Sequence, residues 1–135
     1  MFSNDRFPLI PGPTPLAEAS HLRRILGGPR ILIKRDDLTG RIVGGNKIRK
    51  LEYLLADARR AGATHVVTGG GAQSNHAAQT AVCARMAGLE AVLVLSRPTP
   101  GRPCGNLLVH RLLGITPEYV DRYEPDDLEQ AMRQC

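Results

Sequence analysis

The strongest constraint on the fold is a strand, a glycine turn and a helix in direct succession between residues 64 and 87. The apolar run Thr64 to Thr68 contains adjacent valines, Gly69 to Gly71 follow it, and an alanine-rich helical pattern extends from about Asn75 to Ala87. Gly88 is placed to end that helix. A strand joined to a helix by glycines exposes backbone N–H groups to an anion. The succession therefore predicts an α/β unit with an anion-compatible turn.

The same alternation continues toward the C-terminus. Ala91 to Leu95 is apolar without alternation, as expected for a strand covered on both faces. Later segments are predicted as a helix, a strand and a helix at about 106–113, at about 115–120 and from Pro125. Pro117 favours an edge or irregular position for the last strand. Strands alternating with helices predict an α/β fold in which crossover helices cover a parallel sheet in three layers.

The first part of the chain has a different character. Residues 1–30 are rich in proline and glycine, with one short helix predicted around Leu16 to Leu26. A short strand is predicted at Ile31 to Lys34, and Gly40 to Gly45 form a loop. We expect this region to be an arm that lies over another part of the protein.

A lysine is predicted at the start of the next helix. Gly44 and Gly45 allow a sharp turn, Asn46 is a favoured N-cap residue, and Lys47 would lie in the first helical turn. The positive end of the helix dipole and the cations Arg49 and Lys50 disfavour another positive charge there, which favours a neutral amine able to attack a carbonyl. The alternative is that Lys47, Arg49 and Lys50 form a solvated basic face.

The rest of this helix is amphipathic. Apolar residues recur at three- and four-residue spacing until Gly62, and we expect them to face inward: Ile48, Leu51, Leu54, Leu55 and Ala58. The helix would hold Lys47 on a rigid support.

The glycine turn is followed by three polar residues, Ser74, Asn75 and His76. Their hydroxyl, amide and imidazole groups could bind a ligand. Ser74 and Asn75 are also preferred N-cap residues, and His76 could equally face solvent in the first turn. An amine and an anion-compatible turn, presented where two helix N-termini converge, suit an anionic aldehyde cofactor held as a Schiff base. Both motifs together predict pyridoxal-phosphate chemistry.

Several segments carry a resemblance to a known family. Gly44 to Tyr53 and Gln73 to His76, with Arg35-Asp36-Asp37 upstream, are similar to the D-cysteine desulfhydrase and 1-aminocyclopropane-1-carboxylate deaminase family. Further segments resembling that family are Pro13 to Leu16, Gly105 to Leu108 and Arg111 to Gly114. The family consists of pyridoxal-phosphate enzymes of the tryptophan-synthase-β-like fold, fold type II, and this chain resembles its N-terminal portion.

The resemblance implies roles for individual residues. Lys47 would bind pyridoxal 5′-phosphate covalently, and Asn75 would hydrogen-bond the cofactor's phenolic oxygen. Ser74, Asn75 and His76 would hold the substrate carboxylate, with Lys47 and Ser74 as the candidate catalytic residues. The implied reaction is β-elimination from D-cysteine to pyruvate, ammonia and sulfide, and His76 favours that substrate. The alternatives are a 1-aminocyclopropane-1-carboxylate deaminase or a non-catalytic remnant of such an enzyme.

The resemblance also implies an organisation. Residues 1–45 would be an arm and strand of the family's larger domain, and residues 46–135 a small α/β domain that ends early, before the phosphate-binding loop of the C-terminal region. A small amino-acid substrate and a homodimer are the implied partners.

Other functional classes fit the sequence less well. The chain has 135 residues and a net charge of +5, but its cations are dispersed and it has no Trp, so we expect no nucleic-acid partner. A Walker loop and a serine-hydrolase elbow are excluded because the glycines precede neither Gly-Lys-Ser nor Gly-x-Ser-x-Gly. An NADP-type site remains open, since Arg97 follows the second strand.

Metal, membrane and secretory functions are also not indicated. Neither the histidines nor the odd set of cysteines, Cys83, Cys104 and Cys135, has the spacing of a metal site, and we expect reduced thiols. The N-terminus lacks a signal-peptide pattern, and we find no apolar run that could span a bilayer. A cytoplasmic location is therefore expected.

Overall fold

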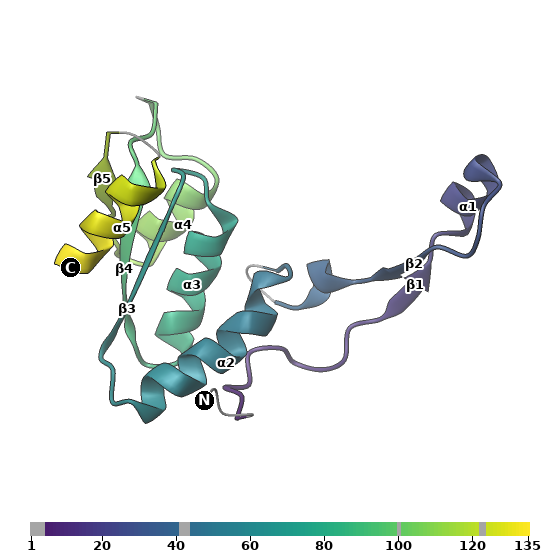
Figure 1. The fold of residues 1–135 in the computed structure, drawn as a ribbon, viewed down its shortest axis with the longest axis horizontal. Helices are drawn as coiled ribbons and strands as arrows, with labels where there is room; N and C mark the ends of the chain where they lie inside the picture. The colour runs from purple at the N-terminus through teal and green to yellow at the C-terminus, as the bar shows by residue number, and fades with distance from the viewer. Residues whose placement is uncertain (1–4, 41–43, 100, 122–123) are drawn as a thin grey trace.

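The computed structural model describes residues 5–40, 44–99, 101–121 and 124–135. An α/β body contains most of the chain, and an N-terminal arm extends away from it (Figure 1). The body comprises, in order, α2 (Lys47–Arg60), β3 (His65–Gly70), α3 (Asn75–Met86), β4 (Glu90–Ser96), α4 (Asn106–Leu112), β5 (Glu118–Val120) and α5 (Pro125–Gln134). Most of these elements agree closely with the spans predicted from sequence.

The three strands of the body form one parallel sheet in the order β3-β4-β5. In that sheet Val66 pairs with Ala91, and Ser96 pairs with Val120. The short β5 begins just after Pro117 and lies at the edge, as predicted, because proline cannot donate a hydrogen bond within a sheet. The predicted α/β class with a parallel sheet is confirmed.

Helices cover both faces of this sheet. A Cβ atom on Gly69 would lie 3.0 Å from Met132 Sδ of α5, whereas one on Gly70 would lie 2.7 Å from Ser74 Oγ at the start of α3. Successive residues of a strand point to opposite faces, so α5 and α3 lie on opposite sides of β3. The body therefore has the predicted three layers.

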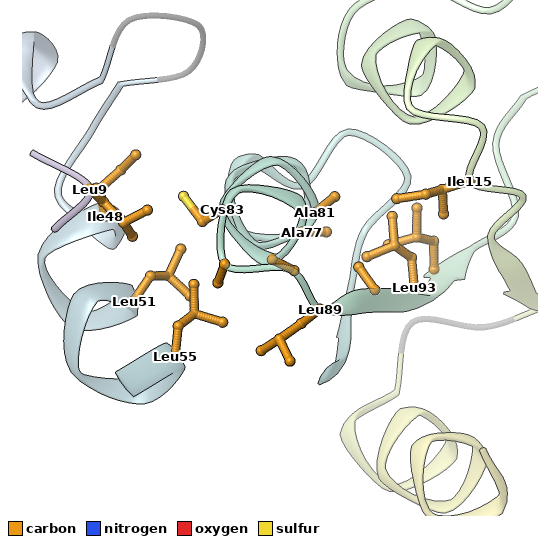
Figure 2. Packing of buried hydrophobic residues seen from close by; sticks show 14 residues of the cluster. Leu9, Ile48, Leu51, Leu55, Ala77, Ala81, Cys83, Leu89, Leu93 and Ile115 are labelled. Carbon is orange, nitrogen blue, oxygen red and sulfur yellow. The ribbon is translucent and has the colours of Figure 1, made fainter. Parts of the chain in front are cut away.

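Helix α3 lies at the centre of the hydrophobic core. Eight consecutive residues, 77–84, are buried, because α2 packs on one side of the helix and β4 on another. Figure 2 shows Leu51 and Leu55 of α2 on one side of α3 and Leu93 of β4 on the other. The alanines of α3 allow this close approach because they have short side chains.

One apolar residue of α2 does not face the core. Leu54, which we predicted to be inward, is 45% exposed, while Leu51 and Leu55 are almost fully buried. At 3.6 residues per turn, Leu54 lies roughly 90° around the helix from the mean direction of the buried Ile48, Leu51 and Leu55. It therefore falls at the rim of the contact with α3.

The arm is built from two strands and a helix. Strand β1 (Leu16–Glu18) pairs antiparallel with β2 (Leu32–Lys34), and α1 (Ser20–Leu26) lies between them. The predicted helix over Leu16 to Leu26 is therefore wrong for its first turn, because the backbone of residues 16–18 pairs with β2 instead. Large apolar side chains of the arm are exposed, including Leu16, Leu22, Ile25, Leu26, Leu32 and Ile33.

Candidate functional site

The loop that leads into Lys47 is organised by Thr39, whose side chain is fully buried. The Thr39 hydroxyl accepts a hydrogen bond from the Gly45 N–H at 2.9 Å. Its own proton can go to the carbonyl of Asp36 at 2.8 Å or of Gly45 at 2.9 Å. A Cβ atom on Gly44 would lie 2.4 Å from the Asp37 carbonyl oxygen, so glycine is required there. This packing fixes the start of α2.

Asn46 occupies the N-cap position of α2, as predicted, but it does not cap the helix with its side chain. Asn46 has helical angles, φ −64° and ψ −18°, and its side chain makes no capping hydrogen bond. A turn already forms before the helix, because the Ile48 N–H donates to the Gly45 carbonyl at 3.3 Å. Gly45, with φ of 134°, provides the change of direction instead.

Arg49 is anchored rather than solvated. Its Nε lies 3.0 Å from both carboxylate oxygens of Asp36, and a second guanidinium nitrogen donates to Thr14 Oγ1 at 2.9 Å. Hydrogen bonding from Arg49 lowers the pKa of Asp36 below its ordinary value. The contact connects α2 to the arm, so the reading of Lys47, Arg49 and Lys50 as one solvated basic face does not hold for Arg49.

Ser74 caps α3, as the simpler alternative predicted. Its Oγ accepts a hydrogen bond from the Ala77 N–H at 3.2 Å, and its own N–H donates to Gly71 at 2.9 Å. The Ala72 N–H donates to Ser96 Oγ of β4 at 3.1 Å. The hydroxyl proton of Ser74 is not used by the cap and could be donated to an anion.

His76 is half-buried in the first turn of α3. Burial lowers the pKa of its imidazole, and the charges of Lys50 and Lys47 lower it further. Its Nδ1 is buried without a hydrogen-bond partner among the described residues. Helices α2 and α3 pack against each other, so charges on α2 act on this ring.

Gln79 of α3 connects this helix to the loop that precedes Lys47, a role that the sequence alone did not predict. Its Nε2 donates to the Gly44 carbonyl at 2.9 Å, three residues before Lys47. Asn75 and Gln79 are four residues apart and lie on the same face of α3. A polar residue at this spacing within an alanine-rich helix was the signal that could have identified it.

A second connection reaches Asn75 from the loop before α4. Asn106 Nδ2 donates to Asn75 Oδ1 at 2.8 Å and to the Gln73 carbonyl at 2.9 Å. The Gln73 side chain accepts from the Asn106 N–H at 2.9 Å and donates to the Cys104 carbonyl at 3.1 Å. In the sequence, Asn106 stands only within the family-like segment Gly105 to Leu108, and no local signal gives it a role.

A parallel α/β sheet with a lysine at one helix start and an asparagine at the next suits one class of protein, the fold type II pyridoxal-phosphate enzymes. The model of the pyridoxal-phosphate dependent enzyme family matches residues 8–135, and the chain belongs to that family. The predicted resemblance is thereby confirmed.

Individual relatives agree with this assignment. The chain is 44% identical over 123 residues to a Pyrococcus horikoshii protein provisionally named 1-aminocyclopropane-1-carboxylate deaminase, covering 91% of this chain and 37% of that protein. It is 51% identical over 96 residues to the D-cysteine desulfhydrase of Salmonella paratyphi B, covering 69% of this chain and 29% of the relative. The chain thus spans less than two fifths of these relatives.

Solved structures agree as well. A crystal structure described as an ACC deaminase homologue matches 96% of this chain and 39% of its own, with 42% identity and a TM-score of 0.87. Maize serine racemase matches 91% of this chain and 35% of its own, at 19% identity and a TM-score of 0.63, which supports the fold alone.

The remaining alternatives find little support in the described residues. Arg97, the residue on which an NADP-type site would depend, forms an exposed ion pair with Asp121, with 2.9 Å between Nε and the carboxylate oxygen. Within the described ranges, no group of three or more His, Cys, Asp or Glu side chains is arranged to hold a metal ion. Of the helices in that same part of the chain, none is both long and apolar enough to span a membrane.

Proposed function

We propose that this chain is the lysine-bearing part of a pyridoxal-phosphate-dependent lyase that acts on a small amino acid, most like D-cysteine desulfhydrase. The observation that carries the proposal is the hydrogen bond from Gln79 to Gly44, which holds the loop before Lys47 against α3, the helix that begins at Asn75. Support also comes from the 51% identity to a D-cysteine desulfhydrase. A 1-aminocyclopropane-1-carboxylate deaminase is the second candidate, supported by the 44% identical relative.

The residues of the site fit the cofactor. Lys47 supplies a partly exposed amine that can hold an aldehyde, and Asn75 has its amide nitrogen directed away from Asn106 and available as a donor. The unpartnered Nδ1 of His76 and the spare proton of Ser74 add polar groups beside them. When bound, pyridoxal phosphate supplies an electron sink for carbanion chemistry.

The chain's own residues suggest a division of labour. Lys47 would both hold the cofactor and take the substrate's α-proton at Nζ. Its neighbours on α3 would hold the substrate carboxylate, Ser74 by donating its hydroxyl proton and Asn75 and His76 through their N–H groups. The burial of His76 lowers its pKa, which favours a neutral ring that can donate from one nitrogen and accept at the other.

The arm supports the proposed domain organisation. Residues 1–45 would belong to a larger domain, and residues 46–135 to the small domain. The arm extends from the body with Leu16, Ile25 and Leu26 each more than 60% exposed (Figure 1). Such apolar surface is normally covered in a native assembly. A homodimer and a cytoplasmic location remain part of the proposal on the strength of the family resemblance.

The first test is to mix the purified chain with pyridoxal phosphate, reduce it with borohydride and locate the phosphopyridoxyl adduct by peptide mass spectrometry. We expect a stoichiometric adduct at Lys47. It should disappear in Lys47→Ala and persist in Lys50→Ala, a matched control one turn further along α2. Scattered labelling, or equal loss in both variants, would contradict the proposed site.

The same labelling experiment distinguishes a functional part of an enzyme from a non-catalytic remnant of one. If Lys47 is labelled, release of sulfide from D-cysteine and of ammonia from 1-aminocyclopropane-1-carboxylate should be measured next. A chain that is folded by circular dichroism yet shows no adduct would be a remnant.

A further inference from the structure

We propose that Asn106 is a positioning residue that sets the orientation of the Asn75 amide and thereby makes Asn75 a hydrogen-bond donor toward the cofactor. The proposal rests on the function proposed above and deepens it. Asn106 begins α4 and lies 31 residues from Asn75 in sequence. It would act only through Asn75.

The orientation of each amide in this network follows from backbone groups. The Gln73 carbonyl can only accept, so the Asn106 side-chain atom 2.9 Å from it must be the nitrogen. The same nitrogen lies 2.8 Å from the Asn75 side chain, and the atom facing it there must therefore be the acceptor Oδ1. The oxygen and the nitrogen of the Asn75 amide therefore cannot exchange places without loss of this hydrogen bond.

Gln73 is oriented by the same logic. The Asn106 N–H can only donate, so it faces the Gln73 side-chain oxygen at 2.9 Å, and the Cys104 carbonyl can only accept, so it faces the nitrogen at 3.1 Å. A Cβ atom on Gly105 would lie 2.7 Å from that oxygen, so the glycine leaves room for this contact. The loop before α4 is therefore held against the turn before α3 at both side chains.

This orientation leaves the amide nitrogen of Asn75 available to a ligand. With its oxygen occupied by Asn106, the amide leaves its nitrogen and both N–H groups free to donate. Gln79, one turn further along the same face of α3, holds the loop before Lys47. Donors are what an anionic oxygen on a ring requires, and charge-assisted hydrogen bonds are the stronger kind. An amide of the opposite orientation would present an oxygen and repel such a group.

The test is Asn106→Asp, which keeps the shape and reverses the hydrogen-bonding character. A carboxylate cannot donate to Asn75, so the Asn75 amide should turn and give its N–H groups to Asp instead. We expect the pyridoxal phosphate concentration for half-maximal labelling of Lys47 to rise by roughly 10-fold to 100-fold, the worth of one charge-assisted hydrogen bond. Gln130→Glu, an exposed amide-to-acid change on α5, should have no such effect.

Two further measurements make the outcome decisive. In the Asn75→Ala background, Asn106→Asp should change the half-maximal concentration by less than about 3-fold, since little coupling remains once the partner is absent. An equal loss in both backgrounds would overturn the proposal. Side-chain amide hydrogen exchange by NMR, without cofactor, should show Asn106 protected and Asn75 exchanging rapidly, with Asn75 becoming protected in Asn106→Asp.

The exchange pattern also separates this inference from the proposed function. If the unmodified chain gains no adduct at Lys47 but shows the expected exchange pattern, the proposed function fails and the amide orientation stands. If Asn75 is the protected amide in the unmodified chain, the orientation is reversed and the inference fails, whatever the cofactor does.

Discussion

The buried hydroxyl of Thr39 offers a sharp test of how the start of α2 is held. Thr39→Val replaces the hydroxyl by a methyl group of similar size, so no cavity forms. The Gly45 N–H then loses its acceptor. The carbonyls of Asp36 and Gly45 keep a donor each, because the Thr39 N–H donates to Asp36 and the Ile48 N–H donates to Gly45. One such group left unsatisfied costs about 1–3 kcal/mol, so we expect a loss of about 1–3 kcal/mol in the free energy of unfolding.

The chain contains a matched control for this substitution. Thr80 in α3 is also buried, at 4% exposure, but its hydroxyl has no hydrogen-bond partner in the described structure. Thr80→Val removes a buried polar group that gains nothing from its surroundings, so it should be neutral or stabilise the protein by up to about 2 kcal/mol. The two variants make the same chemical change with opposite expected signs.

Urea denaturation followed by far-ultraviolet circular dichroism gives the free energy of unfolding of both variants. The dependence of this free energy on urea concentration should be the same in both, which shows that the denatured state is unchanged. The half-maximal pyridoxal phosphate concentration for labelling Lys47 should rise in Thr39→Val and stay unchanged in Thr80→Val. The reasoning is refuted if Thr39→Val is no more destabilising than Thr80→Val, because the Thr39 hydroxyl would then contribute nothing to the loop.

Further predictions concern the buried histidine and cysteine. Both ring nitrogens of His110 are buried without partners in the described residues, and burial lowers its pKa below 6.5. The unfolded state therefore binds more protons, so the His110 contribution to stability is complete above about pH 6.5 and is lost as the pH falls toward the folded-state pKa. Denaturation midpoints between pH 7 and 5 should decrease less in His110→Leu than in the unmodified chain, and an unchanged slope would contradict this assignment. Burial also raises the pKa of Cys83 to about 11. An aromatic disulfide reagent should therefore modify the exposed Cys104 and Cys135 in the native chain, and Cys83 only in urea. Rapid labelling of Cys83 in the native chain would contradict this and show that α3 opens.

The site itself was partly visible in the sequence. Lys47 and Ser74 to His76 stand at helix starts that glycines mark, and the structure brings these segments together through Gln79. Their roles toward a cofactor stay a prediction. The partners that orient them were not visible, because Gln79 meets Gly44 across 35 positions and Asn106 meets Asn75 across 31. No periodicity reports contacts at such separations.

The sequence by itself determined the elements whose signals are local. The apolar spacing in α2 and α3 and the uninterrupted apolar run of β4 predict their spans closely, because helix and strand periodicity depend only on neighbouring residues. Tertiary structure decided the rest. Residues 16–18 became a strand because β2 pairs with them, and Leu54 became exposed because α3 contacts a different part of the helix surface. In each case the deciding group is distant in sequence, and its hydrogen bond or packing contact exists only once the chain has folded.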